Sequence, residues 1–377
     1  MKNNKLTTLA ASALLATTTS VSAADVEVLH WWTSGGEAAS VNYLKGKLSD
    51  AGVGWTDFAV AGGGGENAMT VLKSRAISGN PPTAAQIKGP SIQEWGDLGF
   101  LADIDGVANE NNWDDLLPTV VSDVMKHEGK YVAAPVNVHR VNWMWSNPEV
   151  FRAAGATIPT TWDDFMVQAK KLQDAGYIAL AHGGQPWQDA TVFEAVVLGV
   201  GGADYYNKAF VEMDMDALNS DTTVEVFETF GNLRQFIDAN APGRDWNVAT
   251  SMVIEGQAGM QIMGDWAKGE FKVAGKNVGT DFVCSAAPGT SGAHTFNIDS
   301  FAFFAQGTTA GTGAQNIMAA FVASSASGSL VPSFAHGMAL PSAVAGAVVD
   351  SATNFFNSDQ SAEEGAAQLV ASMAAAM

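Results

Sequence analysis

The residues best suited to chemistry are tryptophans that stand next to carboxylates or amides at several places in the chain. A tryptophan ring is a flat apolar plate with one N–H donor, so it suits a site with a dry face and a polar edge. Carboxylates and amides hold paired hydroxyl groups, and ionised acceptors make the stronger bonds. Such side chains together favour binding of a neutral polyol, with packing in a core as the alternative for each tryptophan. The groups are Trp31 and Trp32 with Glu37, Trp187 between Gln185 and Gln188, Asp245 with Trp246, and Asp265 with Trp266.

Catalytic motifs are poorly represented. The six histidines are dispersed, without an HExxH motif or a helical i, i+4 pair, so no metal site is predicted. The chain has no Gly-x-Ser-x-Gly elbow, and Cys284, the only cysteine, lacks an activating context. The glycine run 62–65 lacks the Lys-Ser/Thr pair that closes a phosphate loop. No cofactor is expected, and a glycosidase pair of carboxylates stays open as an alternative.

Composition and charge narrow the class of protein further. The 377 residues carry a formal net charge of −20, which argues against binding to nucleic acid or to an anionic membrane. The length is typical of about two domains. Residues 1–23 have the basic, apolar and small-residue regions of a secretory signal peptide, with cleavage expected after Ala23. Because no later run is apolar enough to span a membrane and no lipid-anchoring cysteine follows the signal, we expect a free periplasmic protein.

Alternating strand and helix patterns predict an α/β fold that places polar residues at the ends of strands. A helix is expected over 66–78, where glycines precede an apolar stripe and Gly-Asn-Pro-Pro follows it. The next strand, over 84–89, ends with Gln86 and Lys88. The ends of strands in an α/β sheet are where such folds bind ligands, with ordinary solvated residues as the alternative.

Two later strands carry further polar candidates. The strand over 131–136 contains Pro135, which lacks an N–H donor, so it is expected at an edge or an end of a sheet. An apolar strand over 301–305 follows Asp299 directly. Burial of this carboxylate at the start of a strand would require hydrogen-bond partners.

Several sequence blocks resemble bacterial periplasmic sugar-binding proteins of extracellular solute-binding protein family 1, most closely the glucose/mannose branch that serves ABC importers. These blocks cover residues 27–37, 134–140, 159–165, 263–269 and 332–339, beginning with Glu-Val-Leu-His-Trp-Trp-Thr-Ser-Gly-Gly-Glu. The resemblance extends over nearly the whole mature chain. It implies a hinged two-lobe fold with one monosaccharide, glucose being the expected one, in the cleft between the lobes. The first lobe would comprise 24–135 and 286–325, and the second 136–285 and 326–377.

The resemblance also implies roles for individual residues. The sugar-binding positions that it indicates are Trp31, Trp32, Glu37, Gln86, Lys88, Trp246, Trp266, Asp299 and His336. Weaker candidates, with a structural role as the alternative, are Asn137, His139, Trp187, Asp265 and Asn297. The protein would be a monomer without enzymatic activity that delivers its sugar to an inner-membrane ABC permease, and closure of the lobes would signal the bound state. Replacing Trp32 or Asp299 by alanine is expected to weaken binding far more than stability, unless these residues are core.

One segment departs from the family pattern. Before the block that contains His336, relatives carry a few dozen additional residues with a Lys-Gly-Ser-Ile-Pro-x-Arg stretch, whereas this chain has a small-residue segment over 310–329. A helix and a basic cleft residue would be lost with that stretch. A binding protein for an oligosaccharide and a secreted carbohydrate-active enzyme are the alternatives to a monosaccharide-binding protein.

Overall fold

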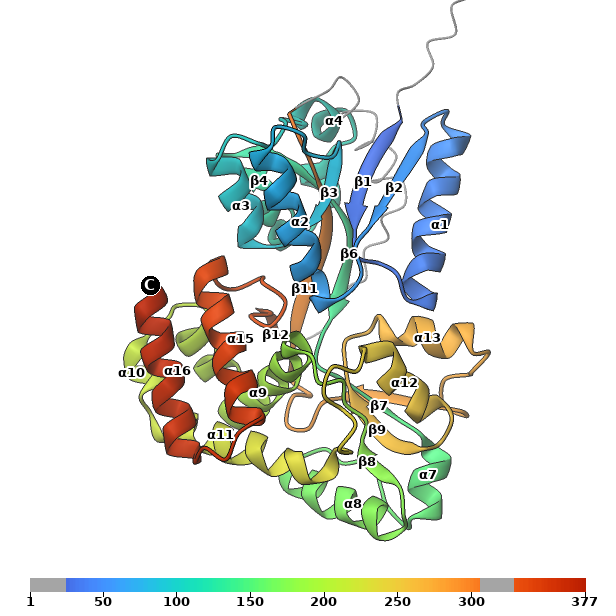
Figure 1. Cartoon of the computed structure of the whole chain (residues 1–377), viewed down its shortest axis with the longest axis vertical. Coiled ribbons are helices and arrows are strands. Elements are labelled where there is room, and N and C mark those ends of the chain that lie inside the picture. Colours follow the sequence, from blue (N-terminus) through green and yellow to red (C-terminus); the bar gives the residue numbers. More distant parts are fainter. Residues whose placement is uncertain (1–24, 306–328) are drawn as a thin grey trace, which may run out of the picture.

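The computed structural model describes residues 25–305 and 329–377, which form two lobes, each with its own sheet and core (Figure 1). This is the two-lobe α/β class expected from the sequence. The expected signal peptide, and nearly all of the segment 310–329, lie outside the described residues. Within the described residues, no helix is both long and apolar enough to cross a membrane.

The first lobe is built around a mixed sheet with the strand order β12-β11-β3-β1-β2, in which β6 also pairs with β11. β1 runs parallel to β2 and β3, whereas β11 runs antiparallel to β3 and β6. The strands are β1 (Val26–His30), β2 (Trp55–Ala59), β3 (Ala84–Ile87), β6 (Ala133–Arg140), β11 (Ala293–Phe303) and β12 (Ser329–Pro332). The helices are α1 (Gly35–Asp50), α2 (Glu66–Ile77), α3 (Pro90–Asp97), α4 (Asp105–Glu110), α5 (Trp113–Leu116) and α6 (Thr119–Val124), with a small hairpin of β4 (Lys126–His127) and β5 (Lys130–Tyr131).

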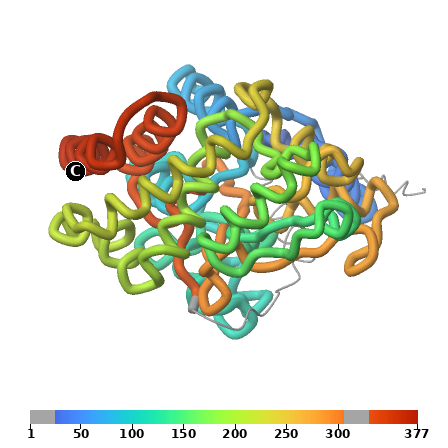
Figure 2. Tube along the Cα trace, turned by 90° about the horizontal axis from the view of Figure 1, so that it is seen from below, coloured from blue at the N-terminus to red at the C-terminus, as the bar shows by residue number. Residues whose placement is uncertain are grey.

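The second lobe has a four-stranded sheet with the order β10-β7-β9-β8 and is richer in helices. Its strands are β7 (Trp143–Ser146), β8 (Ile178–Leu180), β9 (Ala258–Ile262) and β10 (Val283–Ala286). Its helices are α7 (Pro148–Ala153), α8 (Trp162–Asp174), α9 (Pro186–Phe210), α10 (Met215–Leu218), α11 (Asp221–Leu233), α12 (Trp246–Ile254), α13 (Ala267–Val273), α15 (Ser342–Phe356) and α16 (Ala362–Ala376). Phe355 packs on Phe227, so α15 joins α11 in one core, and Figure 2 shows α15 and α16 (red) at one end of this lobe.

Two long strands, β6 and β11, connect the lobes (Figure 1). Phe301 at one end of β11 lies in the core of the first lobe, and Ala293 at the other end lies in the core of the second. β11 is therefore much longer than the strand expected over 301–305, and Asp299 lies within it rather than before it. The reason is that Asn297, Asp299 and Ser300 are polar residues whose burial in a strand requires hydrogen-bond partners, and most of these partners lie far away in the sequence.

Pro135 lies within β6 opposite Ser300, where a bulge shifts the pairing register. The missing N–H of proline is tolerated at such a bulge. β6 pairs only with β11 among the described strands, which agrees with the expected edge position, but it continues past Pro135 to Arg140. The expected lobe boundary at 135/136 falls within β6, and we retain the division of the chain into lobe segments as a proposal.

Candidate functional site

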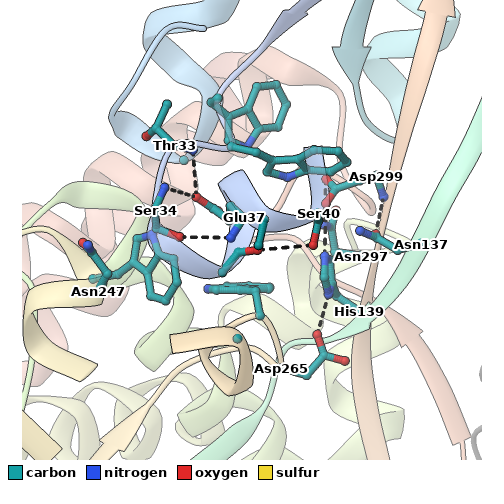
Figure 3. Close-up of a pocket in the computed structure, with 18 of the residues that line it drawn as sticks. Thr33, Ser34, Glu37, Ser40, Asn137, His139, Asn247, Asp265, Asn297 and Asp299 are labelled. Atoms are coloured by element: carbon teal, nitrogen blue, oxygen red, sulfur yellow. Dashed lines mark hydrogen bonds and ion pairs between the residues drawn. The ribbon is translucent and has the colours of Figure 1, made fainter. Parts of the chain in front are cut away.

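A cleft of about 1260 Å³ lies where the two lobes meet, and Figure 3 shows its polar lining. Its walls come from the loop after β1, the glycine run before α2, the starts of α9 and α12, the segment around α13, and strands β6 and β11. All but one of the residues expected from the sequence line it. They are Trp31, Trp32, Glu37, Lys88, Asn137, His139, Trp187, Trp246, Asp265, Trp266, Asn297, Asp299 and His336.

A chain of charged groups in the cleft joins the two connecting strands to the second lobe (Figure 3). His139 on β6 contacts Asp265 through Nδ1, and its Nε2 lies 3.1 Å from Oδ2 of Asp299 on β11. Burial disfavours the charged imidazole, but attraction and hydrogen bonding from both carboxylates outweigh it and raise the pKa of His139 to about 10. The imidazole is therefore protonated at neutral pH and both ring nitrogens donate.

Asp299 has the partners that its burial requires. Its side chain is 5% exposed and accepts from Nδ2 of Asn297 at 3.3 Å as well as from His139. Its backbone N–H donates to Oδ1 of Asn137 at 3.4 Å. Burial acts to raise the pKa of Asp299, but His139 and then Lys88 outweigh it, so the pKa lies below its ordinary range and the group stays ionised. A charged acceptor is thus fixed in the cleft.

Aromatic rings form one wall beside this chain. His336 lies between Trp266 and Trp187, with ring centroids 5.1 Å and 5.9 Å away, and the edge of His139 meets Trp266 at 5.2 Å. His336 is 7% exposed, and its Nε2 is 3.0 Å from Oγ1 of Thr191. Burial first, and then the nearby Lys88 charge, lower the pKa of His336 well below its usual value, so this ring is neutral.

Gly62, Gly63 and Gly64 also line the cleft, next to the tryptophans. Gly64 has φ +59°, and a Cβ there would lie 3.0 Å from the ring of Trp187 in the other lobe. Gly65 has φ +112°, and a Cβ there would lie 3.1 Å from the ring of Trp31. Lys88 Nζ lies 5.1 Å from the centroid of the Trp31 ring. The glycines are therefore needed for both the left-handed backbone and the close approach of two tryptophans.

Three of the residues expected to contact the ligand have structural roles. Gln86 is fully buried and does not line the cleft. Its Oε1 accepts from the N–H of Trp31 at 3.3 Å and its side chain also interacts with the carboxylate of Asp299, so contact of Gln86 with the ligand stays a prediction. Trp32 is 8% exposed and packs edge-on against Phe301 in the core of the first lobe. Glu37 accepts from the N–H groups at 33 and 34 and completes a capping box with Ser34 at the start of α1.

The cleft lining also contains polar residues beyond those that the resemblance indicates, and two of them belong to the tryptophan groups named from the sequence. Gln185 and Asp245, which hydrogen-bond to each other at 2.6 Å, line the cleft at the starts of α9 and α12. Asp245 directly precedes Trp246, and Gln185 lies two residues before Trp187. Their proximity to a tryptophan is therefore the sequence signal that indicates them. The other polar additions are Thr33, Ser34, Ser40, Tyr43, Asn247, Lys268 and Lys272.

Acidic and basic groups occur in equal number in the cleft lining. The lining has four carboxyl side chains, and against them three lysines and the protonated His139. The eight charged groups are Glu37, Asp245, Asp265, Asp299, Lys88, Lys268, Lys272 and His139. Such a cleft favours a neutral, hydroxyl-rich molecule over an ion. Among the described residues, no group of three or more His, Cys, Asp or Glu is arranged to hold a metal ion.

Comparison with known proteins gives the family. The family of bacterial extracellular solute-binding proteins matches residues 53–319. A probable sugar-binding periplasmic protein of Rhizobium meliloti is 50% identical over 304 residues, which is 81% of this chain and 73% of that relative. A protein of the same description from Brucella melitensis is 51% identical over 280 residues, which is 74% of this chain and 66% of that relative.

Solved structures with the same fold are more distant in sequence. The bacterial solute receptor AcbH, described as having an exclusive preference for β-D-galactopyranose, superposes with a TM-score of 0.77 at 17% identity, covering 94% of this chain and 98% of that one. A sugar transporter component of Bacillus licheniformis in complex with stachyose superposes with a TM-score of 0.70 at 12% identity, covering 94% and 100%. At these identities the likeness shows the two-lobe fold alone.

Proposed function

Because the chain belongs to the family of bacterial extracellular solute-binding proteins, we propose that it captures a neutral sugar between its lobes in the periplasm and delivers it to an inner-membrane ABC permease. The names of the relatives from Rhizobium meliloti and Brucella melitensis support a sugar as the ligand. The observation that carries the proposal is the ionised Asp299, buried beside an aromatic wall in a cleft with acidic and basic groups in equal number.

Recognition in this proposal divides between two kinds of contact. The carboxylate of Asp299 accepts hydrogen bonds from sugar hydroxyls, and charge-assisted bonds of this kind are the strong ones. Trp266 and Trp31, which come from different lobes, cover the apolar C–H faces of the ring. Lobe closure brings the two sets together, and the closed form is the state that the permease recognises. Micromolar affinity would correspond to about −8 kcal/mol.

A monosaccharide, with D-glucose tested first, is the proposed ligand, and an oligosaccharide is the second candidate. The cleft volume of about 1260 Å³ favours the second candidate, because pockets for small molecules commonly measure roughly 300–1,000 Å³. The polar residues around Asn247 and Lys272 would then contact an additional ring.

The family is one of binding proteins, and the carboxylates of the cleft agree with binding rather than hydrolysis. A glycosidase needs one carboxyl group with a raised pKa as the acid. Here Asp265 and Asp299 both bond to the same imidazolium of His139, and the pKa of Asp299 is lowered. The pKa of Glu37, another carboxyl group of the lining, is raised by burial, but this side chain accepts from the backbone N–H groups at 33 and 34 at the start of α1. In keeping with the family, we propose that the sugar leaves the cleft chemically unchanged.

Calorimetric titration of the chain from Ala24 onward tests the proposal, with tryptophan fluorescence followed in parallel. D-glucose, D-galactose and D-mannose are compared with maltose and maltotriose, and one-to-one binding of a member of either group is the expected result. Tighter binding of maltotriose than of every monosaccharide would favour the second candidate. Absence of binding to all five sugars by cooperatively folded protein would contradict the proposal.

A variant of Asp299 separates a designed site from incidental binding. Asp299→Asn keeps the shape of the side chain but removes the charge, and it should raise the Kd about 10- to 100-fold because a hydrogen bond to a charged group is worth about 1.5–3 kcal/mol. Asp238→Asn is the matched control, since Asp238 pairs with Arg244 outside the cleft lining. An equal effect of both changes on the Kd would argue against a direct role for Asp299.

A further inference from the structure

His336 reaches the cleft from a short segment that the helix α9 holds in place. This segment, residues 333–336, follows β12, and β12 lies beside α9 (Figure 1). Glu194 of α9 accepts from the N–H of Ala335 at 3.1 Å and from the hydroxyl of Ser333 at 2.8 Å. Oγ of Ser333 in turn accepts from the N–H of His336 at 3.2 Å. The backbone of the segment is therefore fixed without any contribution from the His336 side chain.

The ring of His336 has a partner of its own on the same helix. Its Nε2 lies 3.0 Å from Oγ1 of Thr191, which is buried one turn before Glu194. The same Oγ1 lies 2.8 Å from the carbonyl oxygen of Trp187. Because a carbonyl oxygen has no hydrogen, this contact is attractive only if Thr191 donates its proton to Trp187. A hydroxyl group has a single proton, so Oγ1 of Thr191 accepts from His336, and the hydrogen of that bond is on Nε2.

A neutral ring with its hydrogen on Nε2 has a free lone pair on Nδ1. Burial first, and then the positive charge of Lys88, lower the pKa of His336 well below its usual value. The negative charge of Asp299 opposes this effect, and the positive charge of His139 adds to it. Nδ1 of His336 has no hydrogen-bond partner in the described part of the chain, and some of its surface stays accessible.

We propose that Thr191 fixes His336 as the tautomer with hydrogen on Nε2, so that Nδ1 meets the sugar as a hydrogen-bond acceptor. Thr191 does not line the cleft, so it is a positioning residue. Residues of α9 share one hydrophobic core with residues 334 and 335, so the tautomer does not depend on the angle between the lobes. The acceptor role rests on the proposed function. Together with Asp299, it would make the site select hydroxyl groups that donate.

Heteronuclear NMR of the protein with isotope-labelled histidine tests the tautomer, because protonated and unprotonated ring nitrogens differ in chemical shift. The signals of His336 are those that disappear in His336→Gln. At neutral pH the wild type should have hydrogen on Nε2 and none on Nδ1. Thr191→Val keeps the shape of the side chain without its hydroxyl and should give a mixture of tautomers. The reverse tautomer or a charged ring in the wild type would overturn the proposal, also if Thr191→Val failed to fold.

Thr250 provides a matched control. It lies in α12 four residues after Trp246, whose carbonyl oxygen accepts from its hydroxyl at 3.0 Å, but its Oγ1 contacts Gln261 instead of a histidine. Thr250→Val should leave the signals of His336 unchanged, and Thr191→Ser, which keeps a hydroxyl, should give the wild-type tautomer. An unchanged tautomer in Thr191→Val, or the same change in Thr250→Val, would contradict the assignment to Thr191.

Analogues of D-glucose with one hydroxyl replaced by hydrogen or by fluorine test the acceptor role. Fluorine does not donate, so at the position that faces His336 both analogues should bind about three- to tenfold more weakly than D-glucose. The same replacements should matter much less in His336→Ala, which identifies the position. A fluorinated analogue that bound like D-glucose there would show that His336 donates, against the proposal. If D-glucose failed to bind the wild type, the proposed ligand would fail while NMR still decided on the tautomer.

Discussion

The charge on His139 predicts a particular dependence of stability on pH. The pKa of this histidine is about 10 in the folded protein, against an ordinary value of 6.5. Because the folded-state pKa is raised, the contribution to stability is fully present below pH 6.5 and is lost as the pH rises through about 10. The window of the effect is therefore neutral to alkaline, where most aspartates and glutamates no longer titrate.

The size of the effect follows from the same interval. About 3.5 pH units separate the two pKa values, and each is worth about 1.4 kcal/mol, so about 5 kcal/mol is the ceiling. Solvent reaches 16% of the His139 side chain and 33% of Asp265, which screens part of the attraction. The low pKa of Asp299 arises from the same interaction and adds no second contribution.

Denaturation by urea at pH values between 6.5 and 10, on wild type and on His139→Gln, measures the effect. Glutamine does not titrate, so the difference in free energy of unfolding between the two proteins should shrink steadily as the pH rises. Other titrating groups are common to both proteins and cancel to a first approximation. A difference that changed by less than about 1 kcal/mol over this range would refute the assignment of a charged His139 between the two aspartates.

Three further predictions concern packing and a second buried group. Gly64→Ala should destabilise the protein more than Gly79→Ala in thermal denaturation, since both residues have positive φ but only a Cβ at Gly64 meets Trp187; equal losses would contradict the steric reason. Trp32→Ala should cost about 3–5 kcal/mol in urea denaturation because the ring is core, so a variant with wild-type stability and impaired sugar binding would restore the expectation from sequence. Burial raises the pKa of Glu194 from 4.5 to about 7 despite its hydrogen bonds, so the wild type should lose free energy of unfolding as the pH rises through this range. Glu194→Gln does not titrate, and its free energy of unfolding should gain up to about 3 kcal/mol relative to the wild type between these pH values. Urea stability profiles that stay parallel for the two proteins would disprove this.

The helices that could be predicted from the sequence are those whose start, apolar stripe and end are marked by residues within the helix or next to it. The helix expected over 66–78 occurs as α2 over Glu66–Ile77, because its apolar stripe and terminating residues lie within the helix itself. Thr161 caps α8 through a similarly local contact, in which its Oγ1 accepts from the N–H of Asp164 at 3.2 Å. The length of β11 was not predictable from such signals, since Asp299 is accommodated in the strand by partners from β6 that are far away in the sequence.

In the cleft, too, the residues that could be predicted are those whose signal lies within a few positions of the chain. Trp31, Trp266 and Asp299 line it, and tryptophan beside a polar residue is visible within a few positions of the chain. The role of Gln86 was not visible in this way, because it accepts from a backbone N–H 55 positions away. The spacing of Ser34 to Glu37 does indicate a capping box, but the neighbouring tryptophans led to the expectation of a ligand contact for Glu37 instead.

The charged groups of the cleft are tied to the strands that connect the lobes. Asp299 and His139 lie on β11 and β6, which pair with each other, and Asp265 follows β9 of the second lobe. Asp265 is nevertheless bonded to β6, because its N–H donates to the carbonyl oxygen of Arg140 at 2.9 Å and its Oδ2 accepts from the N–H of Arg140 at 3.1 Å. We therefore expect the contacts of His139 with both aspartates to persist when the angle between the lobes changes. Because His139 helps to keep Asp299 ionised, a sugar would then meet the proposed charged acceptor before the lobes close around it.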